Sequence, residues 1–372
     1  MKFFKRNRKE VTPSDETEQL ASARTSAAAA AATNSSRNPP SFASPLKSNS
    51  TATTTEIYDI ENIQKNPNSN VQVDEDYNLY IDGEPVYIVK QKKGYLSILF
   101  SLAQTVILIG MMIQCSVAPM RINPMIGPYP DALSYWGAKN SYDILYDHEY
   151  WRLFTPILLH AGIFHLVCNI AVQLDTGAFF EREWGSFIWL LVYLGSAAAG
   201  SILSVIVSPN TIGVGSSGSV CGLFGAKIAE AICRCRESTK TDAKELSHAI
   251  LCEQFASTLC SVILILVFSF IPYVDWAAHV GGLLGGFLMG IMIFSLQIKT
   301  KRWKIGMFAV GLLASVIFYG LGIHQMFNDA KNNVAQEMSD VCGYYQQFFE
   351  GYECRCMLER HEQNGNNAGG GN

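Results

Sequence analysis

The chain has 372 residues, of which 49% are hydrophobic and 16% charged, and its formal net charge is −4. Its basic residues gather in short stretches between long apolar runs, so we expect the lipid bilayer as its partner and no nucleic acid. Ten cysteines in a chain of this length exclude a small disulfide-framed domain.

The amino-terminal segment, residues 1–75, is polar and rich in Ser, Thr, Pro and Asn. Its alanine tract, Ala27–Ala32, is too short and too weakly hydrophobic for a signal peptide. Such a composition predicts a disordered cytosolic arm. A juxtamembrane segment follows at residues 76–95. Apolar residues alternate weakly over residues 71–89 around an Asp82-Gly83 turn, which fits either a short hairpin or an extended segment.

Seven apolar segments follow, each close to the roughly 20 residues that a helix needs to cross a bilayer. The sequence therefore predicts an all-α polytopic membrane protein with its membrane domain at residues 96–325. The expected spans are Leu96–Cys115, Phe154–Gln173, Phe187–Val207, Ser217–Cys233, Ile250–Phe270, Ala277–Ile298 and Ile305–Gln325.

Charges in the short loops predict the orientation. Lys and Arg precede the first span and lie between spans four and five and between spans six and seven, whereas residues 208–214 and 271–276 have none. The positive-inside rule then places the amino terminus in the cytosol and the tail, residues 326–372, in a lumen or outside the cell. Lys227 and Glu230 are interpreted as an ion pair that reaches toward the cytosol, with a proton or substrate path as the alternative.

Three cysteines of this tail, Cys342, Cys354 and Cys356, are expected outside the cytosol, where disulfides form. One disulfide from Cys342 to either of the other two would leave an odd thiol. Zinc binding by the Cys-x-Cys pair with His361 is the alternative interpretation.

Four polar residues inside the spans need partners, because a polar group in the bilayer is costly. Ser217 begins span four, His279 lies near the start of span six, and His165 and Asn169 lie one turn apart in span two. All three spans are expected to run inward from the same face, so the four side chains can meet at one depth.

Small residues at four-residue spacing in spans four and six predict that these helices pack closely. Helix packing alone is one interpretation of this pattern. The other is a nucleophile, because close packing would bring His279 within hydrogen-bond reach of Ser217 and so activate its hydroxyl. His165 and Asn169 would donate to a developing oxyanion. The small residues are Gly218, Gly222 and Ala226, then Ala278, Gly282, Gly286 and Gly290.

Five short motifs occur together between residues 151 and 282. They are Trp151-Arg152, His165-x-x-x-Asn169, Gly177-x-x-x-Glu181-x-x-x-Gly185, Gly215-Ser216-Ser217-Gly218 and Ala278-His279-x-Gly281-Gly282. In this combination the chain resembles the rhomboid intramembrane serine proteases over about residues 123–294.

The resemblance implies a six-helix bundle with one added carboxyl-terminal transmembrane helix, as in the eukaryotic secretory-pathway type. It implies Ser217 as nucleophile and His279 as base, without an acidic third member. Asn169 and His165, with the backbone N–H of Ser217, would form the oxyanion hole. No metal or organic cofactor is implied.

The sequence thus predicts a serine endopeptidase that cleaves transmembrane segments of other membrane proteins, located in the Golgi, the endosome or the plasma membrane. A non-catalytic rhomboid-like binder that acts in membrane-protein quality control is the alternative. A transporter is disfavoured, because neither inverted repeats nor mid-depth charge pairs are visible.

Overall fold

The computed structural model describes residues 71–74, 78–235, 241–269 and 274–356. Most of the predicted disordered arm lies outside the described residues, and so does His361. The described part is a helical bundle with a small sheet, and six helices in it are long and apolar enough to cross a membrane. The chain is therefore a multi-pass membrane protein.

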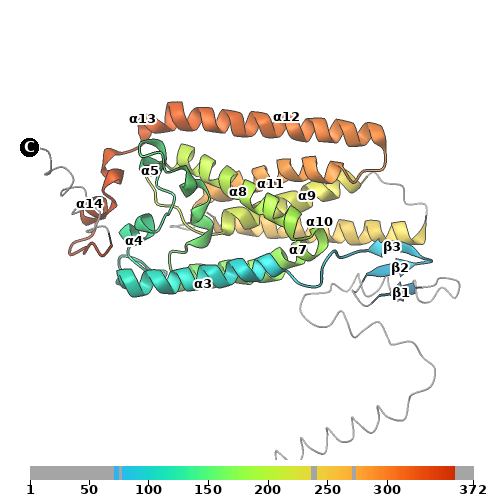
Figure 1. Ribbon diagram of the computed structural model, residues 1–372, viewed down its shortest axis with the longest axis horizontal. Coiled ribbons are helices and arrows are strands. Elements are labelled where there is room, and N and C mark those ends of the chain that lie inside the picture. The colour runs from blue at the N-terminus through green and yellow to red at the C-terminus, as the bar shows by residue number, and fades with distance from the viewer. Residues whose placement is uncertain (1–70, 75–77, 236–240, 270–273, 357–372) are drawn as a thin grey trace, which may run out of the picture. The chain divides into compact units, whose positions relative to one another are not determined.

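The bundle consists of long helices joined mostly by short connections (Figure 1). Its helix α9 is not among the six candidate spans, although the sequence predicted a crossing there. The helices are α3 (Tyr95–Cys115), α6 (Ile163–Val172), which continues through η3 (Gln173–Gly177) into α7 (Ala178–Trp184), then α8 (Ser186–Val207), α9 (Ser217–Arg234), α10 (Asp242–Phe268), α11 (Trp276–Ser295) and α12 (Lys301–Gln325).

Helices α9 and α11 pack backbone to backbone, as the small-residue pattern predicted. A Cβ atom added at Gly282 would overlap the backbone of Gly218, and one at Gly286 would overlap the backbone of Gly222. Only glycine permits such an approach. The predicted packing of these two helices is therefore confirmed.

The second predicted span was placed too early in the chain. Residues 154–162 form short 3-10 turns and a bend, and the long helix runs from Ile163 to Trp184. Pro156 and Gly162 interrupt the helical pattern at its start. Near its other end the helix contains Glu181, which is fully buried. The cost of burying this carboxylate is offset by hydrogen bonds from α3.

The Gly177–Gly185 motif covers the last part of this helix, and its Gly185, with a φ of 85°, ends α7 just before α8 begins; Glu181 lies in its middle. Oε1 of Glu181 accepts the backbone N–H of Leu96, and Oε2 accepts that of Ser97, both at 2.8 Å. These N–H groups belong to the first turn of α3, which has no intrahelical acceptor for them. Glu181 therefore caps α3 and joins it to α7.

Lys227 and Glu230 form the predicted ion pair, with Lys227 Nζ 3.0 Å from Glu230 Oε2. The expectation that they reach toward water was wrong, because Lys227 is buried among partners. Its Nζ also lies 2.6 Å from Oε2 of Glu183 on α7. A buried charge of this kind is stable only when it is paired and hydrogen-bonded. The pair thus fastens α9 to α7.

A three-stranded antiparallel sheet precedes α3. It consists of β1 (Val71–Val73), β2 (Leu79–Ile81) and β3 (Glu84–Tyr87), in the order β1-β2-β3. The Asp82-Gly83 turn joins β2 to β3, and both of its residues have positive φ, 52° and 77°. Such a turn matches the twist of a hairpin. Of the two interpretations left open by the sequence, the hairpin is the correct one.

The loop between α3 and α6, residues 116–162, is folded around a buried arginine. It contains α4 (Pro130–Tyr135), α5 (Ser141–Leu145), η1 (Tyr150–Leu153) and η2 (Thr155–Leu158). Nη2 of Arg152 lies 2.9 Å from Oδ2 of Asp143, and its Nη1 donates to the carbonyl of Ser134 at 2.7 Å. One side chain therefore holds α4, α5 and η1 together.

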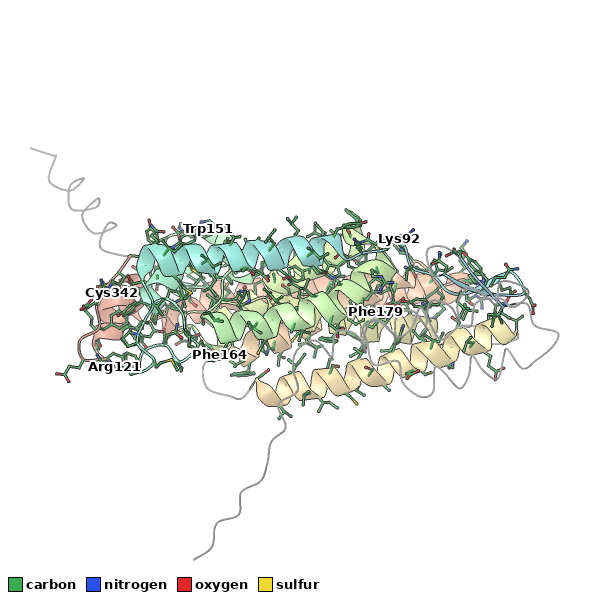
Figure 2. The ribbon with its side chains drawn as sticks, turned by 90° about the horizontal axis from the view of Figure 1, so that it is seen from below. Lys92, Arg121, Trp151, Phe164, Phe179 and Cys342 are labelled. Atoms are coloured by element: carbon green, nitrogen blue, oxygen red, sulfur yellow. A yellow bond between two sulfur atoms is a disulfide. The ribbon has the colours of Figure 1, made fainter. Side chains whose placement is uncertain are left out.

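Residues 326–356 form a compact segment that we call the C-terminal cap. It contains η4 (Met326–Ala330), α13 (Lys331–Asn333), η5 (Gln336–Ser339) and α14 (Val341–Gln346). Cys342 pairs with Cys354, one of the two predicted alternatives. Cys356 pairs with Cys115 at the end of α3, so the expectation of an odd thiol was wrong. Figure 2 shows Cys342 at the end of the bundle opposite Lys92.

Candidate active site

The first turns of α9 and α11 bring a serine and a histidine together. Nε2 of His279 lies 2.6 Å from Oγ of Ser217. Ser217 is the first residue of α9, and His279 lies in the first turn of α11, which Asp275 caps by accepting the N–H of Ala278 at 3.0 Å. The close contact between the two helices thus sets the distance between the two side chains.

A second serine fixes which nitrogen of His279 carries the proton. Ser269, at the end of α10, donates its hydroxyl hydrogen to the carbonyl of Ile265 at 2.7 Å. Its Oγ lies 2.5 Å from Nδ1 of His279 and must therefore accept, since a hydroxyl has one hydrogen. The proton is then on Nδ1, and Nε2 is free to accept from Ser217.

His165 lies beside this pair across a glycine. A Cβ at Gly215 would lie 3.0 Å from Nε2 of His165 and 3.7 Å from Oγ of Ser217. Gly215 has a φ of 120°, which residues with a side chain rarely adopt. The space between His165 and Ser217 therefore stays open. Nδ1 of His165 accepts the N–H of Ala161 at 3.5 Å, so its Nε2 is the donor that faces this space.

The backbone of α9 offers a further donor at the same place. The first N–H to bond within the helix is that of Val220, to the carbonyl of Ser216. The N–H of Ser217 precedes it and has no acceptor inside the helix. An N–H group at a helix start, together with the helix dipole, favours an anion.

Asn169 does not line the cavity in front of Ser217. It is buried, its Nδ2 donates to the carbonyl of His165 at 2.9 Å, and its Oδ1 accepts the hydroxyl of Ser216 at 3.1 Å. The side chain of Asn169 thus holds the residue that precedes Ser217.

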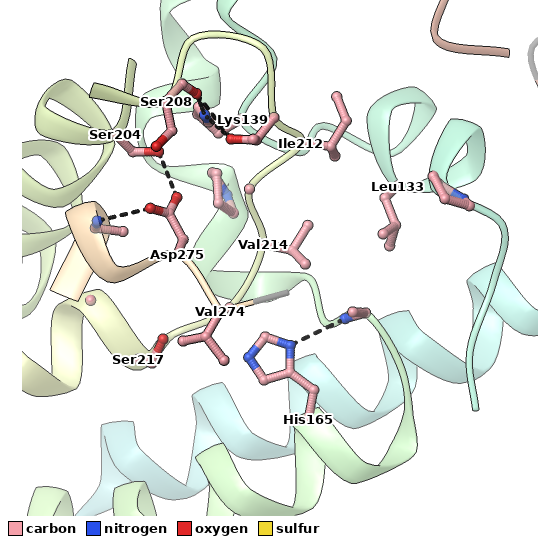
Figure 3. Close-up of a pocket in the computed structure, with 18 of the residues that line it drawn as sticks. Leu133, Lys139, His165, Ser204, Ser208, Ile212, Val214, Ser217, Val274 and Asp275 are labelled. Carbon is pink, nitrogen blue, oxygen red and sulfur yellow. Dashed lines mark hydrogen bonds between the residues drawn. The ribbon is translucent and has the colours of Figure 1, made fainter. Parts of the chain in front are cut away.

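A cavity of about 600 Å³ opens in front of the serine (Figure 3). His165 and Val214 line it near Ser217, while Lys139 and Asp275 lie on a more polar side. Nζ of Lys139 donates to the carbonyl of Ser208 at 2.9 Å. Burial lowers the pKa of Lys139 to about 8, and the nearby carboxylate of Asp275 partly offsets this effect.

His160 packs against His165. The two rings meet edge to face with their centroids 5.2 Å apart, and His160 is fully buried. Burial lowers the pKa of His160 to about 3, and His165 beside it acts in the same direction. His160 is therefore neutral at physiological pH and adds no charge beside the site.

Sequence reasoning missed Ser269 and the role of Ser216. Ser269 lies ten residues before His279 in another helix, and no helical spacing relates the two. The only available signal was a polar residue at the end of a predicted span. Among the described residues, no group of three or more His, Cys, Asp or Glu side chains is placed to hold a metal ion.

Comparison with known proteins matches residues 147–296 to the rhomboid domain. RHOMBOID-like protein 1 of Arabidopsis thaliana is 35% identical over 177 residues, which are 47% of this chain and 42% of that protein. Rhomboid protease GluP of Bacillus subtilis (strain 168) is 30% identical over 194 residues, 51% of this chain and 36% of that protein. The chain spans about half the length of the Arabidopsis relatives that it matches.

Proposed function

We propose that this protein, which carries a rhomboid domain at residues 147–296, is a serine endopeptidase that cleaves transmembrane segments of other membrane proteins. The observation that carries the proposal is the 2.6 Å contact between Nε2 of His279 and Oγ of Ser217. A serine hydroxyl becomes a nucleophile when a base lies within hydrogen-bond reach. The name of the Bacillus relative as a protease supports the same activity.

The reaction begins when Oγ of Ser217 attacks the carbonyl carbon of the scissile peptide bond. Nε2 of His279 takes the hydroxyl proton, and the carbonyl oxygen becomes an oxyanion. The N–H of Ser217 and Nε2–H of His165 donate to it in the space that Gly215 leaves open. Asn169 contributes by holding Ser216 and the carbonyl of His165, which positions both donors.

The intermediate collapses when the carbon–nitrogen bond breaks. His279 returns its proton to the leaving amine, and the acyl group stays on Ser217 as an ester. A water molecule then attacks the ester while His279 takes one of its protons. The bond between the acyl carbon and Oγ of Ser217 then breaks, His279 gives the proton to Oγ, and the acid is released. Ser269 keeps the proton on Nδ1 of His279 throughout, so the acidic third member of a triad is not required.

We infer the topology from the same residues. Helix α9 crosses the membrane as well, as the fourth of seven spans in chain order; its charges and small residues make it less apolar than its neighbours, but other helices enclose it. The positive-inside rule places residues 1–95 in the cytosol and the cap on the other side, where its disulfides are stable. The substrates are single-span or multi-span proteins of that membrane, in the secretory pathway.

Replacing the nucleophile tests the activity. We expect Ser217→Ala to lower cleavage of a co-expressed single-span substrate by about 10⁴-fold or more. Ser257→Ala, at an exposed serine of α10 that does not line the cavity, is the control and should leave cleavage unchanged. Equal cleavage by wild type and Ser217→Ala would disprove the assignment.

Covalent labelling separates the protease from a non-catalytic binder of membrane proteins. A fluorophosphonate probe should label the wild type at Ser217 and should fail with His279→Ala, because the base is then missing. A protein that retains its membrane partners but shows neither labelling nor cleavage would be a binder.

A further inference from the structure

The C-terminal cap supplies one wall of the cavity that contains Ser217. Four aromatic side chains of the cap line this cavity, together with apolar residues of the loop between α3 and α6, among them Met125 and Leu133. At about 600 Å³ the cavity is within the range of sites that hold organic ligands. The four cap residues are Tyr344, Tyr345, Phe348 and Phe349, which we call the aromatic wall.

We propose that the aromatic wall is a substrate subsite, which binds a large apolar side chain of the polypeptide close to its scissile bond. The inference rests on the proposed protease function and adds the substrate feature that the site selects. The four residues of the aromatic wall are distinct from the reacting pair. The wall therefore determines which substrates bind, while Ser217 and His279 carry out the reaction.

The aromatic wall is held in place by covalent and polar contacts. The disulfide of Cys356 with Cys115 ties the end of the cap to α3. The hydroxyl of Tyr352 donates to Oδ1 of Asp131 at 2.6 Å, and the N–H of Arg355 donates to Oδ2 at 3.1 Å. Burial, followed by the carboxylate of Asp131, raises the pKa of Tyr352, so the hydroxyl keeps the proton that it donates.

The apolar base of the cap adds to this rigidity. Met326 and Met338 are almost fully buried in a cluster with residues of α5 and α8, including Ile144 and Val205. The amide of Asn140 donates to the carbonyl of Met338 at 3.0 Å. A rigid wall loses little conformational entropy when a ligand binds, which favours recognition.

Part of the apolar surface of the aromatic wall is exposed. Phe348 is 63% exposed, although its ring lies 5.1 Å from that of Tyr344. Phe349 is half-buried and stacks on Tyr345 with the centroids 6.4 Å apart. Exposed aromatic groups on a rigid frame mark binding surfaces. A polypeptide is the occupant that the geometry favours over lipid, because all four side chains line the cavity that also contains the nucleophile.

The test uses the full-length protein in detergent and a set of single-span substrates. In each substrate one Phe is moved through an alanine and serine stretch around the scissile bond. We expect one position at which Phe raises kcat/KM of the wild type by about tenfold over Ala, a typical value for an apolar pocket. In Phe348→Ala/Phe349→Ala this ratio should fall to about 1. Phe187→Ala, an exposed phenylalanine on α8, is the matched control and should keep the ratio.

Two further measurements keep the outcome unambiguous. Phe348→Leu/Phe349→Leu retains an apolar wall and should preserve part of the ratio. A small fluorophosphonate reports the reactivity of Ser217 itself, so its labelling rate should be the same in all variants. An unchanged ratio, or an equal loss for Phe and Ala substrates, would overturn the inference. An equal loss that occurs only in vesicles would assign the wall to lipid contact instead.

The labelling also separates the inference from the function on which it rests. Wild-type protein that is neither labelled at Ser217 nor active on any substrate would disprove the protease function, and the subsite would fall with it. Wild-type protein that is labelled and cleaves, but shows no preferred position for Phe, would disprove the subsite alone.

Discussion

Ser269 shows how a single hydroxyl outside the reacting pair can decide the state of the base. Because the hydroxyl of Ser269 donates its single hydrogen to the carbonyl of Ile265, its oxygen can only accept a hydrogen bond from Nδ1 of His279. Nε2 is then the accepting nitrogen that Ser217 requires. A side chain without this hydroxyl would let the imidazole populate the other tautomer, in which Nε2 carries the proton and the serine is not activated.

We therefore predict that Ser269→Ala lowers kcat by about 2- to 10-fold, the range for one hydrogen bond of about 0.5–1.5 kcal/mol. KM should not change, because Ser269 does not contact the substrate. Ser269→Thr keeps a hydroxyl that can bond the same carbonyl and should restore kcat. Steady-state cleavage in detergent measures both constants. A rise in KM at constant kcat would assign Ser269 to a structural role only.

At the scale of elements, the distance between Ser217 and His279 depends on the contact between α9 and α11. The two helices meet at Gly218–Gly282 and Gly222–Gly286, where an added methyl group would overlap backbone atoms. The helices must then move apart, and His279 moves with α11. The packing of small residues in α9 and α11 therefore sets the geometry of the Ser217–His279 pair.

Gly286→Ala should destabilise the protein by about 1–3 kcal/mol through overpacking, and it should reduce cleavage although it lies two turns from the site. Gly320→Ala on α12 is the matched control, because a Cβ there meets nothing within 4 Å. It should be neutral or stabilising, since alanine favours a helix by about 0.5–1 kcal/mol. Thermal unfolding in detergent and substrate cleavage check both variants. Equal behaviour of the two would contradict the role of the contact.

Most of the helices, and the packing of α9 against α11, could be predicted from the sequence. The length of an apolar segment and the spacing of small residues within it are local signals. The second span was misplaced because Glu181 and Gln173 look too polar for a membrane helix, and their partners lie on α3, far away in the sequence. The disulfide between Cys115 and Cys356 was not predicted for the same reason: its two cysteines lie far apart in the sequence. Contacts of this kind depend on the assembled bundle, so no spacing rule reveals them.

For the molecule as a whole, the charge buried in the site cavity links stability to pH. The pKa of Lys139 is about 8 in the folded protein, against an ordinary value of 10.5, because the side chain is buried. Between these two values the unfolded chain binds more protons than the folded one. Stability therefore rises with pH across this window, and below pH 8 the contribution of Lys139 is constant.

Lys139→Met removes this titrating group. The contribution of Lys139 should therefore appear as a pH-dependent difference in stability between the wild type and the variant. Between pH 8 and 10.5, the free energy of unfolding of the wild type should rise relative to that of the variant by up to about 1.4 kcal/mol per pH unit. Thermal unfolding in detergent at several pH values provides the measurement. The variant also loses the bond to the carbonyl of Ser208, so only the pH dependence is diagnostic. Parallel curves across this window would contradict the assignment.

The disulfide between Cys115 and Cys356 gives the assembly of the protein a fixed order in time. Its cysteines lie 241 positions apart, so the bond cannot form until synthesis has passed residue 356. Ser217 and His279 are both made before that point. A newly made chain thus contains Ser217 and His279 before the disulfide can lock its aromatic wall in place.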